Sequence, residues 1–361
     1  MTNPWLQLNG KTYSYAQLKS GGGTTPVTDF ERSALAFCRA WIGDQEHFSL
    51  STSGSTGAPK TITFRREQME ESARLTAAAL DLKPEYHALL CLDPRYIAGQ
   101  MMLVRSFVTG MNVIAVEPSA NPFDSIQPDL KIDFAAIVPY QLQTILDSAT
   151  GKNNLNKLKA VLVGGAAISA KVKALLHPLH CLVYSTYGMT ETLSHVALQM
   201  LNGPSPQDYF QVLPGIAVNT DARGCLTIAA GYLGKDDIIT NDLVELLGPG
   251  QFKRLGRLDR VINSGGVKII PEKIEKACEA IIEELELANR CFVAGLPDDR
   301  LGTRVVLVVE GQPFSESMQR DLYTRMEKVL GKYEVPKEMR FIPRFAETSS
   351  QKVDRNATLN R

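Results

Sequence analysis

The sequence predicts an α/β protein with a smaller second domain, and three patterns along its 361 residues support this prediction. From about Arg65 to Tyr184, apolar runs of strand length alternate with segments of helical periodicity, which is typical of a largely parallel sheet flanked by helices. Beyond Pro204 the runs become short and are interrupted by Gly and Pro, which indicates a small β-subdomain. From Pro271 onward the pattern favours a compact α+β unit. We therefore expect an N-terminal domain over residues 1–258 and a C-terminal domain over residues 259–361.

The elements of the first unit are predicted from the period and length of their apolar runs. A strand-loop-strand hairpin is expected where Phe48–Leu50 and Ile62–Phe64 flank a polar loop. Helices are predicted over Arg66–Leu80, Gly99–Thr109, Tyr140–Asp147 and Ser169–Leu176, and strands over His87–Leu92, Asn112–Val116, Phe134–Val138, Ala160–Val163 and Cys181–Tyr184.

The second domain is predicted to begin with a helix. Pro271 suits its first position, and Glu272 suits its first turn, where a carboxylate faces the positive end of the helix dipole. One apolar face is expected in the core, formed by Ile274, Ala277, Cys278, Ile281, Ile282 and Leu285. The unit is completed by strands over Cys291–Ala294, Val305–Val309 and Met339–Ile342 and by a helix over about Glu316–Leu330.

Composition favours a small-molecule ligand. The 39 basic and 39 acidic residues cancel, so charge gives no argument for nucleic acid or an anionic membrane as a partner. The N-terminus lacks the basic and apolar regions of a signal peptide, and no apolar run reaches about 18 residues, so we expect a cytoplasmic location. The six cysteines are far apart, without a Cys-x-x-Cys pair, which predicts reduced, buried thiols.

The segment from Ser51 to Thr61 predicts a phosphate-binding loop. Its glycines allow successive backbone N–H groups to converge on an anion, its hydroxyls add short donors, and its lysine adds a point charge. Ala58–Pro59 separates Gly57 from the lysine, so the loop is not a Walker P-loop. A flexible linker is the alternative interpretation, but the apolar flanks favour a tethered loop. The candidate ligands are Ser51, Thr52, Ser53, Gly54, Ser55, Thr56, Gly57 and Lys60.

Two further segments follow predicted strands. Small residues over Val163–Ala167 allow a flat ring to lie against the backbone. Ser185–Glu191 follows the next strand and offers an aromatic face, hydroxyls and a carboxylate. Either segment alone is more often an ordinary turn after a strand. Together they predict a site for adenine, phosphate and metal.

From about Phe48 to Arg355 the chain resembles the adenylate-forming family of acyl-CoA synthetases, adenylation domains and luciferases. Six ordered segments carry the resemblance, which implies the fold of that family: a large α/β domain with a β-subdomain and a smaller, mobile C-terminal α+β domain. These segments are the Ser51–Lys60 loop, Gly164-Gly165-Ala166, Tyr187-Gly-Met-Thr-Glu191, Thr240-Asn-Asp242, Gly256-Arg-Leu-Asp-Arg260 with Ser264-Gly-Gly-Val-Lys268, and Ser350-Gln-Lys-Val-Asp-Arg355.

The resemblance implies ATP, Mg²⁺ and CoA as ligands and assigns a role to each motif residue. Because a hard divalent ion prefers carboxylate and phosphate oxygens, Glu191 suits the metal. A charge at Lys352 would stabilise the α-phosphate during attack. Arg257 and Asp259 as a surface pair, and Lys352 as an ordinary tail lysine, are the alternatives. The implied roles are an adenine shelf at Gly164, Gly165 and Ala166, an adenine-stacking ring at Tyr187, a catalytic phosphate contact at Thr190, a catalytic metal ligand at Glu191, a ribose clamp at Asp242, a ribose or phosphate contact at Arg257, a hinge at Asp259, a pantetheine path at Gly265 and Gly266, and a catalytic lysine at Lys352.

Three departures from the family pattern affect these expectations. Asn241 replaces a glycine of the ribose motif, and Gln351 replaces the glycine before the catalytic lysine, so local backbone geometry is expected to differ. Only 50 residues precede the phosphate loop. A wall of the N-terminal domain is therefore expected to be absent or supplied by a partner subunit, which makes a homo-oligomer possible.

Two segments that border the acyl pocket resemble the family members that activate o-succinylbenzoate for menaquinone biosynthesis. These are Pro94–Arg105, followed by Gly110-Met-Asn-Val, and Gly188–His195, followed by Val196-Ala-Leu. The substrate implied is an aromatic keto-dicarboxylate, which requires an apolar slot and a donor for the carboxylate that does not react. The candidate donors are Tyr96, Arg105, Ser194 and His195.

The alternatives stay open at this stage. Arg105 is equally expected on a solvated helix face, and His195 as the cap of a turn. The enzyme alternative is an aryl- or fatty-acyl-CoA ligase with a different acid. The alternative outside enzymes is a nucleotide-binding scaffold that has lost its chemistry.

Overall fold

A computed structural model describes residues 5–21, 25–51, 61–287, 289–347 and 353–360. Its main feature is a 13-stranded sheet in the order β12-β13-β14-β15-β11-β10-β9-β8-β7-β5-β6-β1-β2. The strands from β9 to β1 pair in parallel, which confirms the predicted parallel sheet. They are β9 (Leu182–Gly188), β8 (Ala160–Val163), β7 (Phe134–Ile137), β5 (His87–Leu90), β6 (Asn112–Ala115) and β1 (Trp5–Leu8), and β2 (Lys11–Ser14) pairs antiparallel at the edge.

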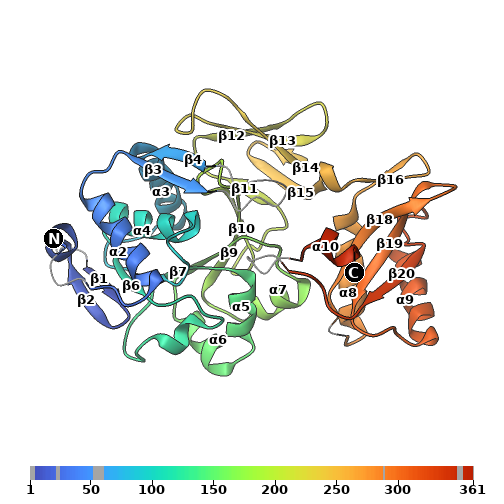
Figure 1. The fold of residues 1–361 in the computed structure, drawn as a ribbon, viewed down its shortest axis with the longest axis horizontal. Coiled ribbons are helices and arrows are strands. Elements are labelled where there is room, and N and C mark those ends of the chain that lie inside the picture. The colour runs from blue at the N-terminus through green and yellow to red at the C-terminus, as the bar shows by residue number, and fades with distance from the viewer. Residues whose placement is uncertain (1–4, 22–24, 52–60, 288, 348–352, 361) are drawn as a thin grey trace.

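Both faces of the parallel sheet are buried, because alternate residues of each strand enter two separate cores. In β5, Ala88 and Leu90 face one core and Leu89 faces the other. The first core includes residues of α2 (Asp29–Ile42), α3 (Arg66–Leu80) and α4 (Ile97–Thr109), and the second those of α5 (Pro139–Leu146), α6 (Ala149–Asn156) and α7 (Ala170–Leu176). Figure 1 shows these two groups of helices on opposite sides of the strands.

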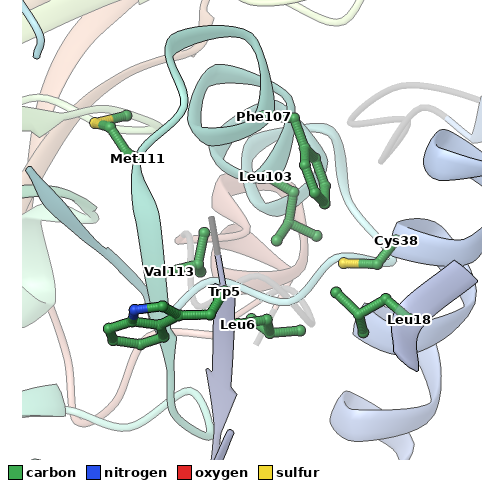
Figure 2. A pocket seen from close by; sticks show the side chains of 8 residues that line it. All are labelled: Trp5, Leu6, Leu18, Cys38, Leu103, Phe107, Met111 and Val113. Carbon is green, nitrogen blue, oxygen red and sulfur yellow. The ribbon is translucent and has the colours of Figure 1, made fainter. Parts of the chain in front are cut away.

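The N-terminal strand β1 packs against α1 (Tyr15–Ser20), α2 and α4. A small cavity of about 10 Å³ remains between them. Figure 2 shows a mostly apolar lining that also includes the thiol of Cys38 and the indole nitrogen of Trp5, and its small volume makes it a gap in the packing. The other lining residues are Leu6, Leu18, Leu103, Phe107, Met111 and Val113.

The predicted β-subdomain continues the large sheet. Antiparallel strands extend it beyond β9, so that the subdomain shares one hydrogen-bonded ladder with the parallel strands. These strands are β10 (His195–Met200), β11 (Phe210–Val212), β15 (Gln251–Arg257), β14 (Ile238–Gly248), β13 (Cys225–Ala230) and β12 (Ile216–Thr220). The predicted hairpin before the large domain is also present, as β3 (His47–Ser51) and β4 (Thr61–Arg65), with Phe48 opposite Phe64.

The C-terminal part has its own core and lies at one end of the molecule, where α8 contacts β15 (Figure 1). Its helix α8 (Pro271–Glu284) begins at the predicted proline and buries Ile274, Cys278 and Ile281. The remaining elements are η2 (Leu258–Arg260), β16 (Ile262–Ser264), β17 (Val267–Ile269), β18 (Cys291–Asp298), β19 (Gly302–Glu310), α9 (Glu316–Val329), β20 (Glu338–Ile342) and α10 (Arg355–Leu359), and η1 (Pro122–Ser125) lies in the large domain.

Two sequence-based expectations are corrected. The strand expected over Cys181–Tyr184 continues to Gly188 as β9, because β10 pairs with its second half and satisfies the backbone there. Ser185 to Gly188 therefore lie within a strand and do not follow it. The sequence analysis also missed helices α1, α2, α6 and α10. The six cysteines are free, as expected; five of them are buried, whereas Cys291 is half-buried. Within the part of the chain that the structure describes, no helix is long and apolar enough to span a membrane.

Candidate active site

The predicted adenine shelf lies at the carboxyl end of the parallel sheet. Strand β8 ends at Val163, directly opposite Ser185 of β9, and Gly164 follows. A Cβ atom at Gly164 would lie 2.4 Å from Oγ1 of Thr186, so only glycine permits this approach. Gly165 and Ala166 are exposed. The carboxyl ends of parallel strands are where ligands bind in open α/β sheets, which agrees with a shelf at this position.

A tight turn connects β9 to β10 and carries the predicted phosphate and metal residues. The N–H of Leu193 donates to the carbonyl of Thr190 over 2.9 Å, and Oγ1 of Thr192 accepts from the N–H of Met189 over 2.9 Å. Thr190 is half-buried and Glu191 is exposed. Glu191 forms no hydrogen bond or ion pair with any other described residue, so its carboxylate is available to an ion.

A Mg²⁺ ion fits this single carboxylate when phosphate oxygens supply the other ligands. Among residues 5–21, 25–51, 61–287, 289–347 and 353–360, no group of three or more His, Cys, Asp and Glu side chains gathers to hold a metal by itself. Mg²⁺ commonly binds through one or two carboxylates together with substrate phosphates. Glu191 would therefore hold the ion jointly with a bound nucleotide.

Tyr187 and Asp242 meet across the sheet. The hydroxyl of Tyr187 donates to Oδ2 of Asp242 over 2.8 Å, and the ring packs at 5.6 Å from Phe210 and 5.0 Å from Phe252. Burial, followed by the charge of Asp242, raises the pKa of Tyr187. Nε of Arg254 donates to the other oxygen of Asp242 over 3.0 Å. The ring predicted to stack on adenine is thus mostly enclosed, and the carboxylate predicted to clamp ribose is held from both sides.

Arg257 lies opposite Asp242 in the β14–β15 ladder, and its side chain binds the predicted hinge residue. Its Nε and Nη2 donate to the two oxygens of Asp259 over 2.9 and 2.7 Å. This hydrogen bonding holds the pKa of Asp259 below its ordinary value. Arg257 and Asp259 thus form an ion pair in this structure, as the alternative interpretation expected. A nucleotide contact of Arg257 stays a proposal.

Three of the four candidate substrate residues form a buried cluster. Arg105 of α4 is 3% exposed and His195 of β10 is 6% exposed, while Ser194 is half-buried between them. Nη2 of Arg105 donates to Oγ of Ser194 over 2.5 Å and lies 3.5 Å from Nδ1 of His195. The solvated-face alternative for Arg105 is therefore wrong. His195 begins a buried strand, so the turn-cap alternative is also wrong.

Arg105 is a buried cation without a carboxylate partner among the described residues. Its Nε has no hydrogen-bond partner there, and its Nη2 reaches only a hydroxyl and an imidazole. Burial lowers the pKa of Arg105 to about 10, so the guanidinium remains charged at neutral pH. A buried charge that lacks a partner is costly.

The fourth candidate, Tyr96, lies apart from the cluster. It precedes the first residue of α4 and is 57% exposed. Nine residues along a helix span about 13 Å, so Tyr96 and Arg105 are at opposite ends of α4. The structure provides no contact that joins Tyr96 to the other three.

Gly265 and Gly266 form the two-residue turn of the β16–β17 hairpin. Their φ angles are +56° and +81°, which is the left-handed region that such a turn requires, so the turn explains both glycines without a ligand. Their role on a pantetheine path stays a prediction. Thr52, Ser53, Gly54, Ser55, Thr56, Gly57, Lys60 and Lys352 lie outside the described residues, as does the side chain of Ser51.

The residues that flank Lys352 are held in place. Glu347 and Val353 form an antiparallel bridge, and the N–H of Asp354 donates to the carbonyl of Ala346 over 2.8 Å. Arg355 donates from Nη1 and Nη2 to the two oxygens of Glu275 on α8, over 2.7 and 3.0 Å. The structure thus places Arg355 in an internal ion pair of the C-terminal domain.

Two site residues escaped the sequence analysis. Arg254 binds Asp242, although regular alternation from Arg257, which lies opposite Asp242, would put Arg254 on the other face of the strand. The register shifts between Leu243 and Val244, so the sequence offered no signal for this contact. Thr76 lies within α3, with Oγ1 at 3.0 Å from Nε2 of His195. Nothing in the sequence around Thr76 distinguishes it from an ordinary helical threonine.

The fold and these side chains define a nucleotide-binding enzyme with its site at the carboxyl edge of a parallel sheet. A family model described as "AMP-binding enzyme" matches residues 46–221, and one described as "AMP-binding enzyme C-terminal domain" matches residues 277–352. The chain belongs to this family of AMP-binding enzymes.

Individual relatives agree with this assignment. An acyl-CoA synthetase (AMP-forming)/AMP-acid ligase II-like protein from Dyadobacter fermentans is 40% identical, with a TM-score of 0.61 over 93% of this chain and 95% of that chain. A probable 2-succinylbenzoate–CoA ligase of Mycobacterium tuberculosis is 29% identical over 339 residues, which is 89% of this chain and 85% of that protein. O-succinylbenzoate coenzyme A synthetase from Bacillus subtilis, solved with ATP and magnesium ion, has a TM-score of 0.72 at 20% identity, covering 86% of this chain and 69% of that chain, and shares the fold.

Proposed function

We propose that this chain is an ATP-dependent acid–CoA ligase that activates o-succinylbenzoate in the cytoplasm. The observation that carries the proposal is the buried guanidinium of Arg105, which has no carboxylate partner among the described residues. A monoacid substrate leaves that charge uncompensated, whereas a dicarboxylate supplies a second anionic group. Relatives named 2-succinylbenzoate–CoA ligase support the same acid.

The reaction has two steps at one site. The reacting carboxylate attacks the α-phosphorus of ATP, which forms an acyl-adenylate and releases pyrophosphate. The thiol of CoA then attacks the acyl carbon and AMP leaves. No covalent enzyme intermediate is required, so the protein contributes by positioning the reactants and stabilising charge.

We assign the residues of the N-terminal domain to the first step. The loop at Ser51–Lys60 and Thr190 are proposed to bind phosphates, Glu191 to hold Mg²⁺, Tyr187 with Gly164–Ala166 to hold adenine, and Asp242 with Arg257 to hold ribose. Arg105 and Ser194 are proposed to bind the spectator carboxylate of the acid. Nη2 of Arg105 bonds Ser194, whereas Nε and Nη1 form no hydrogen bond with a described residue, so the guanidinium retains N–H donors that a carboxylate could use.

The test compares a dicarboxylate with a monoacid in the same assay. Acid-dependent pyrophosphate release and thioester formation are measured for o-succinylbenzoate and benzoate. In Arg105→Gln, loss of a charged donor is expected to lower kcat/KM for o-succinylbenzoate by an amount equivalent to about 1.5–3 kcal/mol. The kcat/KM for benzoate should change little. Arg74→Gln removes an exposed arginine of α3 and serves as the matched control.

Three outcomes distinguish the alternatives. Equal use of both acids by the wild type, with equal losses in Arg105→Gln, would support a ligase for a different acid. Pyrophosphate release with neither acid nor any other in a panel would support a degenerate scaffold. Selective loss with o-succinylbenzoate supports the proposal.

A further inference from the structure

We propose that Thr76 and His195 are positioning residues that aim Arg105 at the spectator carboxylate. The inference rests on the proposed function of Arg105 and adds two residues to it. It also changes the role of His195 from a candidate donor to the substrate into a group that acts through Arg105. The three side chains come from α3, β10 and α4, and all three are at most 6% exposed.

The direction of each hydrogen bond around His195 follows from its neighbours. A guanidinium has no acceptor, so Nη2 of Arg105 donates to whatever it meets. Oγ of Ser194 accepts from Nη2 and is 3.3 Å from Nδ1 of His195, so its own hydrogen is free to bond Nδ1. Nδ1, 3.5 Å from Nη2, must therefore present its lone pair, because a proton there would face the donors of Arg105.

The other ring nitrogen then carries the proton. Nε2 of His195 lies 3.0 Å from Oγ1 of Thr76, to which it donates. Oγ1 of Thr76 in turn donates to the carbonyl of Ser72 over 3.1 Å. Each hydrogen in this row has one acceptor, and the row ends on the backbone of α3. His195 is neutral in this arrangement, which agrees with burial and the charge of Arg105 lowering its pKa well below the usual range.

The row determines which N–H of Arg105 remains available. Nη2 is used by Ser194 and the His195 side of the cluster, whereas Nη1 and the buried Nε form no hydrogen bond with a described residue. Both ring nitrogens of His195 are already engaged, so the imidazole has no donor for a substrate. Thr76, fully buried and on a different helix from Arg105, prevents the ring from turning and thereby fixes the guanidinium.

The decisive variant is Thr76→Val, which keeps the shape of the side chain and removes the hydroxyl. We expect the KM for o-succinylbenzoate to rise by roughly 5–20-fold, in the range of one lost buried hydrogen bond, with kcat little changed. The KM for benzoate should stay within about twofold, because benzoate lacks the group that Arg105 binds. Thr76→Ser retains the hydroxyl and should restore the wild-type KM.

A second readout does not depend on the substrate. The ¹⁵N spectrum of the imidazole should show His195 protonated at Nε2 in the wild type and in Thr76→Ser, and a mixed or reversed tautomer in Thr76→Val. An unchanged tautomer with an unchanged KM in Thr76→Val overturns the inference. An equal KM rise for both acids also overturns it, because it would show a general packing role.

The same measurements separate the two proposals. If Arg105→Gln fails to discriminate between the acids but the tautomer responds to Thr76→Val, the proposed substrate is wrong and the positioning of Arg105 stands. If Arg105→Gln discriminates and Thr76→Val changes neither readout, the proposed function stands and this inference fails. If Thr76→Val does not fold, Thr76→Ser with an altered tautomer or a raised KM would count against the inference, and unchanged values would support it.

Discussion

Arg105 and His195 lie side by side in an interior where the described residues offer neither of them a carboxylate. The imidazole avoids repulsion by staying neutral, and the guanidinium stays charged. The sequence analysis identified both residues from a resemblance, but it left Arg105 between a pocket and a solvated helix face. Helical periodicity did not decide this, because α4 is apolar over most of its circumference and buries Met101, Met102, Leu103 and Val104 as well as Arg105.

The neutral state of His195 predicts how stability depends on pH. The folded-state pKa of His195 is below the usual 6.5, so the unfolded chain binds the additional proton as pH falls below about 6.5. The contribution of this residue to stability is therefore present above that pH and is lost toward acid, by up to about 1.4 kcal/mol per pH unit. The only charged side chain in contact with the ring is Arg105, within the described residues.

Urea unfolding of the wild type and His195→Gln between pH 5 and 7.5 measures this effect. We expect the free energy of unfolding to fall less steeply toward acid in the variant. His177→Gln, which replaces an exposed histidine at the end of α7, is the control. Parallel curves for His195→Gln and the wild type would mean that His195 does not titrate differently on folding.

At the scale of elements, a segment was predicted accurately where its structure depends on local signals, and less accurately where it depends on pairing with a segment elsewhere in the chain. Helix α3 has the predicted bounds, because its polar flanks and its period are both local signals. Strand β9 is longer than predicted, because its second half is stabilised by β10, which the sequence places after an irregular turn. The site residues that depend on such non-local pairing, Thr76 and Arg254 among them, carry no local signal.

The packing of the C-terminal elements predicts that Glu275 stabilises α8. Its carboxylate holds Arg355 and accepts the N–H of Val293 over 2.8 Å, so it connects α8 to α10 and β18. Glu275→Gln should raise the hydrogen-exchange rates of the α8 amides by an amount equivalent to about 1–3 kcal/mol, since Arg355 loses a largely buried partner but keeps some solvent access.

The pair of the exposed Lys273 of α8 with the half-buried Glu334 provides the control. Lys273→Gln is expected to change the exchange of α8 by no more than about 1 kcal/mol, because surface ion pairs contribute little. Equal effects of the two variants would show that the Glu275–Arg355 pair behaves as a surface pair.

At the scale of the whole molecule, the proposed two-step reaction is expected to require a rotation of the C-terminal domain about Asp259. The resemblance placed a hinge there, and the structure locates Asp259 in η2, between the last strand of the large sheet and the β16–β17 hairpin. The Ser51–Lys60 loop was predicted from its glycines, hydroxyls and lysine, whereas the role of Lys352 rests on the resemblance. The side chains of these residues lie outside the described part of the chain, and the domain boundary after residue 258 stays a prediction.

Separate assays of the half-reactions test the assignment of Lys352. Loss of one charged donor to the α-phosphate should reduce acid-dependent pyrophosphate release about 10²–10³-fold in Lys352→Ala. Conversion of a supplied acyl-adenylate to the thioester should continue. Equal loss in both steps, or normal pyrophosphate release, would contradict the assignment.

Asp259→Pro should affect the two steps in the opposite way to Lys352→Ala. A fixed φ at the pivot is expected to hinder rotation and the thioester step while pyrophosphate release persists. Asp259→Ala separates the two contributions of this residue, because it removes the ion pair to Arg257 and leaves φ free. If Asp259→Ala impairs the thioester step as strongly as Asp259→Pro, the ion pair is the important feature and the pivot is elsewhere.

The continuous 13-stranded sheet fixes the relative positions of the strands that carry the proposed nucleotide-binding residues. Tyr187 on β9 and Asp242 on β14 belong to the same hydrogen-bonded ladder, so separating them would require interstrand bonds to break. In the proposed two-step reaction, the residues assigned to adenine and ribose would therefore keep their spacing. Any rearrangement between the two steps would then come from the C-terminal domain.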